Sequence, residues 1–496
     1  MAELVLGIAG VAGTVDVCIK FGKYLVQAYK DYGQVDTLAD ELSVRIQVCW
    51  SRIASQLGII KELESGMTED QRELQSHILR ILQSKLEAAT VVISKPDKHG
   101  SSKRYKALHF LNLRETLEST VADLESWQKR FEPSWFQILK TGPTNIDNVL
   151  KSVARTNTRD RGEPAREGLK FREAFNNSET VKLAEKVLEN LEIQAIPYCE
   201  TELAIKQKEK KHFIIDTVSR DTVALRDARE LASRLRDSNP STFGTLKCKG
   251  VVQLTKEPSL KFVFGVPDGY SRVRSCRELL LSGSTPNSLT TRLKIARQLV
   301  IAVYYVHLYE FVHKNITPET ILTLESLDEE HEQMLVCLAG FQLFRYVDAP
   351  TNTSKTDKRS LVYQHPTRIG GKTVKFVMQH DIYSLGVCLL EIGLWRSLVE
   401  YDGATARLSP VFTNTEGCLS EPDPQAIKEQ LILLSRTELR ICMGDIYSKV
   451  VETCLTCLDE GNTGFGDPQD FDDQGGVEVG SRYVKKIMNS MAVLCF

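Results

Sequence analysis

The chain has 496 residues, of which 42% are hydrophobic and 26% charged, and its 63 Lys and Arg against 65 Asp and Glu give a formal net charge of −2. These values are typical of globular proteins and exclude a collagenous, disulfide-scaffold or intrinsically disordered chain. A net charge near zero also argues against a dedicated nucleic-acid binder, which would carry a strongly basic domain. The length predicts roughly two to four domains.

Twelve cysteines are scattered along the chain, and Cys454 and Cys457 form its closest pair. No second Cys-x-x-Cys pair and no His-x-x-x-His pair accompanies it, so the usual ligand pattern of a zinc site is incomplete. Scattered cysteines without such partners are typical of buried thiols in a reducing compartment. We therefore expect reduced cysteines, and neither a bound metal nor a cofactor.

The N-terminus is apolar but does not follow the pattern of a cleaved leader. Residues 4–13 are all apolar or Gly, and Glu3 precedes them where a signal peptide would carry Lys or Arg. Asp16 and Lys20 then follow without a convincing cleavage site. No stretch reaches the roughly 18 apolar residues that a membrane-spanning helix requires. We expect a retained N-terminal helix in a cytoplasmic protein.

Helical periodicity dominates the first 195 residues, and strand signals are almost absent there. Apolar residues recur at spacings of three and four over 35–62, 69–89 and 113–131. The same spacing over 178–193, with Ser178 as a suitable N-cap, predicts a further helix. The pattern predicts an all-α bundle over residues 1–195.

Two basic stretches interrupt this bundle, at residues 95–106 and 152–172. Charged runs of this kind usually form solvated loops, which is the simpler interpretation. The alternative is that they bind the head groups of anionic phospholipids, at about 1 kcal/mol per basic residue near the surface. Anionic lipids are therefore a candidate partner, whereas nucleic acid is not expected.

Three glycines recur every three residues near the N-terminus, at Gly7, Gly10 and Gly13. Each costs about 1 kcal/mol relative to Ala inside a helix, which indicates that they serve a purpose. One interpretation is close packing inside the bundle. The other is a membrane-active helix that leaves the bundle and enters a bilayer when several copies assemble, although Asp16 would oppose insertion.

The pattern changes after residue 195. Residues 196–211 are predicted to form a linker, and residues 212–268 a small sheet with one helix. Strand-like runs lie at 213–218, 245–254 and 260–266. An amphipathic helix is predicted between the first two, at 221–236, and residues 269–496 are mostly helical.

The string FVHKNITPETIL at 311–322 resembles the protein-kinase catalytic loop H-R-D-L-K-P-x-N-I-L, with His313 in register. Three further strings resemble kinase segments in the expected order. They are LAGFQLF at 338–344 with Phe341 in the D-F-G place, YQHP at 363–366 at the end of an activation segment, and DIYSLGVCLLEI at 381–392 in the helix that anchors the lower lobe. The resemblance implies an α+β protein-kinase-like fold over 212–496, with an upper lobe at 212–268 and a lower lobe at 269–496.

The resemblance places unusual residues at the catalytic positions. Asn315 replaces the Asp that accepts the proton of the substrate hydroxyl, and an amide cannot act as a base near neutral pH. Thr317 replaces the Lys that meets the transferred phosphate, and Thr320 replaces the Asn that holds a second magnesium ion. Gly340 replaces the chief metal-binding Asp. The resemblance therefore implies a pseudokinase, which is not an enzyme.

The upper lobe departs from the kinase pattern as well. It contains no G-x-G-x-x-G string, and the strand that would carry the phosphate-pairing Lys reads FIIDTVSRD, with Asp216 and Thr217 instead. Glu230 on the next helix stands near the place of the Glu that pairs with that Lys, although a helix-surface Glu is the simpler interpretation. The short distance from Phe213 to the hinge-like residues 264–269 predicts a reduced upper lobe whose first strands are shortened or missing.

The residues that build the kinase scaffold are present. Asp381 resembles the Asp that caps the backbone of the catalytic loop, and His313 resembles the packing histidine of that loop. Gly386 is the glycine of the D-x-W-S-x-G helix. A domain that keeps these residues while losing the base and the metal ligands is expected to bind or switch rather than catalyse.

Two segments of the first domain, 2–34 and 168–192, resemble the opening and the distal part of the HeLo domain of fungal heterokaryon-incompatibility proteins. HeLo domains target membranes and kill cells on oligomerisation, which implies self-association through residues 1–195. A helical domain followed by a catalytically dead kinase also resembles the necroptosis executioner pseudokinases of animals.

Three functions are consistent with these features. The first is a regulated cell-death effector, in which an unknown upstream protein signals to the pseudokinase, and the released bundle oligomerises at the plasma membrane. The second is a soluble signalling scaffold whose two halves bind protein partners and never meet lipid. The third is an active protein kinase with unorthodox chemistry.

Overall fold

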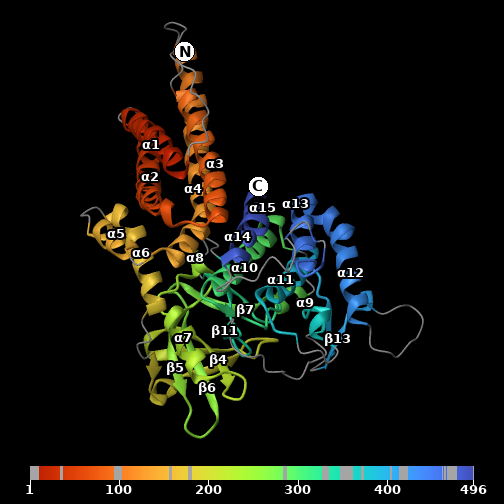
Figure 1. The fold of residues 1–496 in the computed structure, drawn as a ribbon. Coiled ribbons are helices and arrows are strands. Elements are labelled where there is room, and N and C mark those ends of the chain that lie inside the picture. Colours follow the sequence, from red (N-terminus) through yellow and green to blue (C-terminus); the bar gives the residue numbers. More distant parts are fainter. Residues whose placement is uncertain are drawn as a thin grey trace. The chain divides into compact units, whose positions relative to one another are not determined.

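The computed structural model describes residues 10–33, 37–93, 103–143, 145–155, 159–176, 181–282, 287–326, 334–346, 361–369, 374–402, 405–412, 423–460, 462, 465 and 477–494. The chain divides into two compact units, Met1–Glu173 and Ala174–Phe496. Figure 1 draws the first unit in red and orange and the second in yellow, green and blue.

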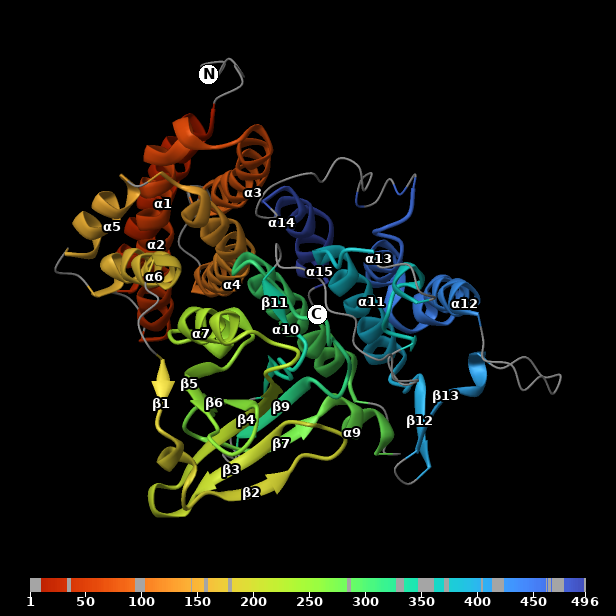
Figure 2. The same cartoon turned by 60° about the horizontal axis from the view of Figure 1, so that its bottom comes forward.

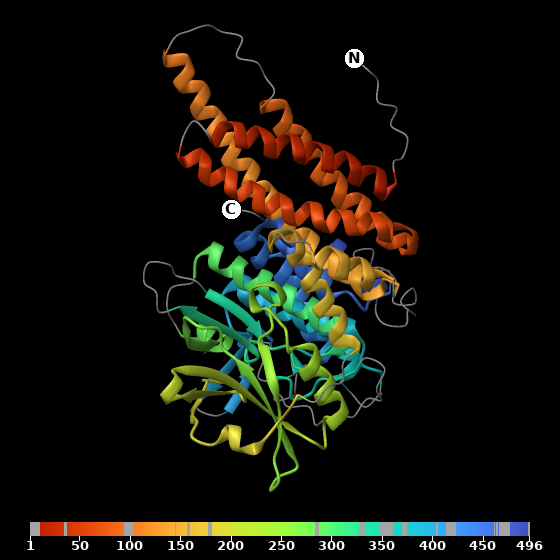
Figure 3. The same cartoon turned by 90° about the vertical axis from the view of Figure 1, so that its left-hand side faces the viewer.

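The first unit is all-helical, as its periodicity predicted. Its helices are α1 (Val11–Gly33), α2 (Thr37–Leu63), α3 (Glu69–Ile93), α4 (Lys103–Thr141), α5 (Ile146–Ala154) and α6 (Arg159–Asn176), and a 3-10 turn η1 (Glu64–Gly66) follows α2. The four long helices lie side by side (Figure 3), with α1 and α4 each packed on both α2 and α3. Trp127, Phe131 and Trp135 of α4 are fully buried in this bundle and form part of its core.

The second basic stretch is largely helical. The prediction of a solvated loop at 152–172 is wrong, because the end of α5 and most of α6 occupy it. Two of its arginines have internal partners: Arg166 donates to the carbonyl oxygen of Ala154 over 3.1 Å, and Arg172 pairs with Asp147. Fewer basic side chains of this stretch are therefore available to an anionic surface.

The second unit begins with a six-stranded sheet in the order β1-β5-β6-β4-β3-β2 (Figure 2). Its strands are β1 (Lys182–Leu183), β2 (Glu192–Ala195), β3 (Glu202–Lys206), β4 (Lys211–Ser219), β5 (Lys247–Gln253) and β6 (Ser259–Gly265). All neighbours pair antiparallel except β1, which is parallel to β5. Helix α7 (Leu225–Arg234) packs on β5 and buries Ala228 and Leu231.

The upper-lobe sheet starts well before residue 212. The helix predicted at 178–193 and the linker predicted at 196–211 are wrong, because β1, β2, β3 and the 3-10 turns η2 (Glu185–Leu188) and η3 (Gln207–Glu209) occupy these residues. Of the apolar residues whose spacing suggested a helix, Val181 is buried and Leu188 and Leu191 pack against the core of the sheet, whereas Ala184 and Val187 are exposed. The predicted shortage of first strands is wrong for the same reason.

The lower lobe is mainly helical. The short helix α8 (Pro240–Phe243) lies between α7 and β5 in the upper-lobe sequence. The lower lobe contains β7 (Tyr270–Ser275), α9 (Cys276–Leu281), α10 (Leu289–Leu308), β8 (Phe311–Val312), β9 (Ile321–Ser326), β10 (Met334–Leu338), β11 (Arg345–Tyr346), η5 (Pro366–Arg368), α11 (Met378–Leu394), β12 (Val399–Asp402), β13 (Thr405–Leu408), η6 (Pro410–Phe412), α12 (Pro424–Arg436), α13 (Glu438–Leu455), α14 (Val477–Tyr483), the π-helical turn η8 (Val484–Met488) and α15 (Asn489–Val493). Small sheets pair β10-β9-β7, β11-β8 and β12-β13. In the part of the chain that the structure describes, no helix is both long and apolar enough to cross a membrane.

Candidate functional site

The catalytic-like loop follows β8 and is held from below by Asp381 of α11. The backbone N–H of His313 donates to Asp381 Oδ2 over 2.7 Å, and that of Lys314 donates to Oδ1 over 2.9 Å. His307 Nε2 lies 3.0 Å from the same carboxylate. Burial acts to raise the pKa of Asp381, but these contacts, led by that of His307, hold it below its ordinary value. The fully buried carboxylate therefore fixes the loop in the way that the sequence led us to expect.

His313 packs inside this loop as a neutral ring. Its Nε2 lies 3.0 Å from the carbonyl oxygen of Ala339, and its ring centroid is 4.8 Å from that of Phe341. Burial lowers the pKa of His313 to about 4. His313 therefore ties the catalytic-like loop to the segment that stands in the D-F-G position.

The positions that would hold the base and the metal ligands contact one another. Asn315 Nδ2 donates to Gln342 Oε1 over 3.1 Å, and Thr320 Oγ1 donates to the carbonyl oxygen of Asn315 over 2.8 Å. The backbone N–H of Thr317 donates to Thr320 Oγ1 over 3.2 Å. These polar atoms satisfy neighbouring groups of the protein.

Gly340 is required by its surroundings. Its φ of 78° lies in the left-handed region, and a Cβ there would lie 2.4 Å from Thr320 Cγ2. Any side chain at this position would be strained and would collide with Thr320. The same position therefore cannot hold a metal-binding Asp in this conformation.

Asp216 lies on β4, at the place where a kinase carries the Lys that pairs with the nucleotide phosphates. It is fully buried, and its Oδ2 accepts the backbone N–H groups of Gly340 over 2.9 Å and Phe341 over 3.2 Å. Its Oδ1 accepts the hydroxyl of Thr201 over 2.5 Å. Burial raises the pKa of Asp216 despite these donors. A carboxylate thus joins β4 to the D-F-G-like segment and to the loop before β3.

That loop, residues 196–201, connects β2 and β3 where a kinase has its Gly-rich loop, and it contains no Gly. Ser275 donates to the carbonyl oxygen of Pro197 over 2.7 Å. The thiol of Cys199 donates to the carbonyl oxygen of Glu319 over 2.8 Å, within the catalytic-like loop. The loop is therefore fastened onto the lower lobe.

The tip of the same loop is conformationally strained. Tyr198 has a φ of 64°, an unfavourable value for a bulky side chain, and its ring centroid lies 4.8 Å from that of Tyr401. Tyr401 in turn donates to Glu319 Oε1 over 2.6 Å. The contacts of the loop with the lower lobe offset this strain.

A fully buried arginine links the remaining parts of the cleft. Arg277 of α9 lies 3.0 Å from Glu319 Oε1 and 3.0 Å from Glu391 Oε1, and it also contacts Ser397. Tyr363 donates to the second oxygen of Glu391 over 2.8 Å. No sequence motif indicated Arg277, because its partners lie 42 and 114 residues away.

Glu230 does not face the cleft as a partner of residue 216. It pairs with Arg226, one turn earlier on α7, over 3.2 Å, and its side chain is 28% exposed. Glu230 is thus a helix-surface residue, which is the simpler of the two interpretations.

Two other predicted positions serve packing. A Cβ on Gly386 would lie 2.7 Å from Cys454 Cβ, so α11 and α13 can approach closely only because residue 386 is Gly. Cys454 and Cys457 are buried free thiols, and Cys457 Sγ lies 3.3 Å from the carbonyl oxygen of Gln379. In the described residues, no group of three His, Cys, Asp or Glu side chains is placed to hold a metal ion.

Of the three N-terminal glycines, Gly7 lies outside the described residues, as does most of the basic stretch 95–106. Gly13 lies in the first turn of α1. Gly10 precedes α1, and a Cβ there would lie 2.8 Å from Glu64 Oε1. The other oxygen of Glu64 accepts the backbone N–H of Ala12 over 3.0 Å and caps the helix.

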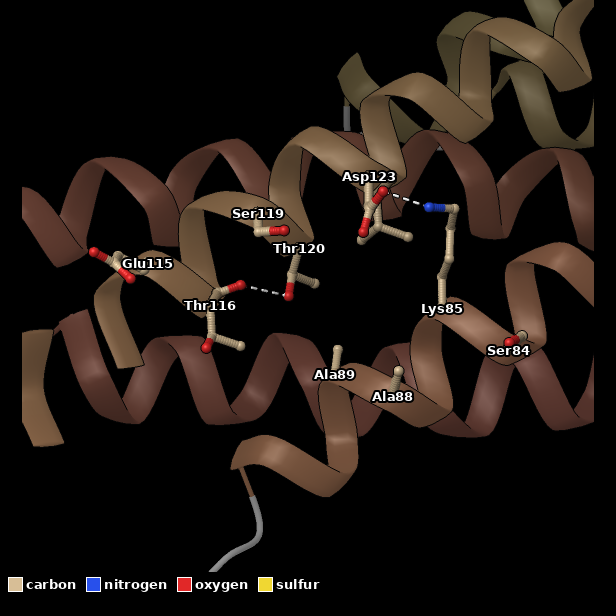
Figure 4. A pocket seen from close by; sticks show the side chains of 10 residues that line it. Ser84, Lys85, Ala88, Ala89, Glu115, Thr116, Ser119, Thr120 and Asp123 are labelled. Carbon is tan, nitrogen blue, oxygen red and sulfur yellow. Dashed lines mark hydrogen bonds and ion pairs between the residues drawn. The ribbon is translucent and has the colours of Figure 1, made fainter. Parts of the chain in front are cut away.

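The bundle has a pocket between α3 and α4 (Figure 4), lined by none of the kinase-like strings. Small and hydroxyl side chains line most of it, and the ion pair of Lys85 with Asp123 crosses one side. Thr120 donates to the carbonyl oxygen of Thr116 over 2.7 Å. We assign no ligand to this pocket.

Residues 225–431 match the family model of protein tyrosine and serine/threonine kinases. This match confirms a protein-kinase-like α+β fold in the second unit, preceded by an N-terminal helical region. No curated protein matches the chain.

Proposed function

We propose that this chain is a non-catalytic signalling protein, a pseudokinase joined to a helical unit that it regulates. The observation that carries this proposal is the position of Asp216. A buried carboxylate stands where a kinase places a cation for the phosphates, and it already accepts the two N–H groups of the D-F-G-like segment.

Nucleotide binding is opposed on physical grounds. A phosphate brought beside Asp216 would place like charges together in a buried site, where their repulsion is strong. Gly340 offers no carboxylate for the magnesium ion that would offset this repulsion, and Asn315 cannot accept a proton from a substrate hydroxyl. Each change alone weakens phosphotransfer, and together they remove the base, the metal-binding carboxylate and the phosphate-pairing cation that a kinase uses.

The loop at residues 196–201 supports the same proposal. A nucleotide needs a loop that covers its phosphates without occupying their place, and Gly allows the backbone to approach them. Here the side chains of Cys199 and Thr201 fix the loop to the lower lobe and to Asp216. Binding a nucleotide would require both contacts to break.

The proposed output lies in the N-terminal unit. Its resemblance to HeLo domains supports oligomerisation and action at anionic membranes, in fungal incompatibility or a related regulated cell death. The cap that Glu64 forms on α1 belongs to the packed bundle. A membrane-active state in which α1 leaves the bundle would break this cap, so activation requires a signal from an upstream protein at the pseudokinase.

Nucleotide binding provides the first test. The full chain is heated with ATP, with and without magnesium, and beside an active kinase as a positive control. We expect no change in Tm and no transfer of phosphate to a general protein substrate. Magnesium-dependent transfer that is lost in Asn315→Ala would overturn the proposal and favour an unorthodox kinase.

Membrane action is tested separately, by dye leakage from phosphatidylserine-containing vesicles with phosphatidylcholine vesicles as the control. We expect leakage by the oligomerised full chain on the anionic vesicles alone. Replacing Gly7, Gly10 and Gly13 with Ser is expected to abolish it. If the vesicles stay intact while the nucleotide test is also negative, the chain is a scaffold without lipid activity.

A further inference from the structure

A charged cluster lies at the end of the activation-like segment, where it packs on α12. His365 is 4% exposed and Lys428 of α12 is 3% exposed, and the Lys428 ammonium lies 3.0 Å from His365 Nε2. Lys428 also pairs with Asp459, which follows α13. Asp459 Oδ1 lies 3.9 Å from the same nitrogen of His365. His365 belongs to the YQHP string, but Lys428 and Asp459 lie outside every kinase-like string.

The contact between His365 and Lys428 requires a neutral imidazole. An ammonium group has only donors, so His365 Nε2 must present its lone pair, and the ring proton must sit on Nδ1. Nδ1 lies 2.9 Å from Thr367 Oγ1, which can accept that proton, and 3.3 Å from the backbone nitrogen of Thr367, whose N–H could donate to Nδ1 only in the other tautomer. The ammonium of Lys428 therefore decides between the two tautomers. Burial lowers the pKa of His365, the charge of Lys428 acts in the same direction, and Asp459 opposes both.

The other groups around His365 are aromatic or basic. Helix α11 contributes His380 and Tyr383, whose ring centroids lie 6.1 Å and 5.0 Å from that of His365. Burial lowers the pKa of His380 to about 3, and the charge of Arg368 on η5 adds to this effect, as a protonated His365 would. Among the described residues, Asp459 is the carboxylate that acts on His365.

We propose that His365, Lys428 and Asp459 form a proton-sensitive latch, which holds residues 363–368 on α12 at neutral pH and releases them on acidification. A protonated His365 would face the Lys428 ammonium, with one carboxylate to serve both cations. The cation that loses Asp459 would remain buried without a partner, which is unfavourable, so the segment moves away from α12. This inference is independent of the proposed function and adds a signal that acts on the kinase-like unit.

Hydrogen exchange on the full chain at pH 7.5, 6.5 and 5.5, corrected for intrinsic rates, measures the latch. In the wild type, we expect the protection of peptides within 361–369 to fall about tenfold from pH 7.5 to pH 5.5, because protonation of His365 favours local opening of this segment. His365→Gln should show a change of less than about twofold, because Gln accepts from Lys428 and cannot be protonated. His77→Gln, an exposed site on α3, is the matched control and should respond as the wild type does.

A second variant tests the latch by removing the charge of Lys428. Lys428→Gln still donates to His365 Nε2 but carries no charge, so a protonated His365 can keep Asp459 and the segment should stay protected at pH 5.5. A wild type that shows no pH response would overturn the latch. So would a response that persists in both variants, or one shared equally by peptides of α10, which would indicate opening of the whole unit.

Discussion

Two buried aspartates, Asp381 and Asp216, hold the catalytic-like loop and the D-F-G-like segment. Asp381 stands where the kinase pattern has an Asp, whereas Asp216 stands where it has a Lys, and their pKa values shift in opposite directions. Asp381 below the catalytic-like loop and Asp216 above the D-F-G-like segment are both fully buried, and each accepts two backbone N–H groups and one side-chain donor. The third donor is His307 for Asp381 and the hydroxyl of Thr201 for Asp216. The pKa of Asp381 is below its ordinary value, whereas that of Asp216 is above it.

This difference separates the scaffold from the cleft. Asp381 keeps a role that any kinase fold needs, since it satisfies the backbone of the catalytic-like loop whether or not chemistry occurs. Asp216 stands where the kinase pattern has a cation that serves the nucleotide, and it accepts the N–H groups of the D-F-G-like segment. Under the proposed function, residues of the scaffold are retained while residues of the chemistry are exchanged for internal contacts.

Replacing each aspartate by Asn gives the sharpest contrast. In Asp381→Asn the amide NH2 must face a backbone N–H, so we expect a loss of about 2–3 kcal/mol in the free energy of unfolding of the second unit. In Asp216→Asn the NH2 can face Thr201, whose hydroxyl also accepts, so we expect a change of less than about 1 kcal/mol. Hydrogen exchange of the α11 amides in urea measures both.

The matched control for this pair is Thr201→Val in each background. Thr201→Val should lower the free energy of unfolding of the wild type, and it should lower that of Asp216→Asn by more, because the amide would lose its acceptor. Its effect should be additive with that of Asp381→Asn. Equal losses in Asp381→Asn and Asp216→Asn would contradict the distinction between the two carboxylates.

The next effect concerns the glycine of the D-F-G position. Gly340→Ala places a Cβ at a φ of 78° and 2.4 Å from Thr320 Cγ2, so we expect a loss of about 2–3 kcal/mol. Thr320→Ser removes the methyl group but keeps the hydroxyl that donates to Asn315. The double variant should therefore recover about 1 kcal/mol relative to Gly340→Ala alone. Additive losses, measured by the same exchange experiment, would show that the two residues do not collide.

The contacts of the scaffold were accessible from sequence because they lie within recognisable strings. The strings around His313 and Asp381 place both residues in the kinase order, and the structure joins them through a hydrogen bond. The contacts that close the cleft were not accessible. Ser275 meets Pro197 across 78 residues and Cys199 meets Glu319 across 120, and no local pattern encodes such pairs.

The prediction of the boundary between the two units at residue 195 was wrong for a different reason. Val181, Leu188 and Leu191 have a spacing that fits a helix, but a short strand followed by a turn can bury the same residues against a sheet. Whether these residues form a helix or a strand depends on the sheet against which they pack, and most of that sheet lies later in the chain. Local periodicity therefore predicted only some of the buried residues, since Ala184 and Val187 are exposed, and it predicted the wrong secondary structure.

Acidification should weaken the scaffold through His313. Its pKa is about 4 in the folded chain and about 6.5 when unfolded, so unfolding takes up a proton between these values. The contribution of the neutral ring is complete above pH 6.5 and is lost as the pH falls toward 4. We expect the slope of unfolding free energy against pH, measured between pH 5 and 6, to be smaller in His313→Gln by about 1 kcal/mol per pH unit. An unchanged slope would mean that His313 is charged in the fold.

The smallest expected effect is at Glu230, for which the sequence left both a catalytic and a structural interpretation open. Its ion pair with Arg226 joins a side chain that is 28% exposed to one that is 87% exposed, so solvent screens most of the attraction. Glu230→Ala should therefore change the free energy of unfolding by less than about 0.5 kcal/mol, and Arg226→Ala should match it within error. A loss above about 1.5 kcal/mol, or a change in the exchange of β4, would show that Glu230 reaches the cleft after all.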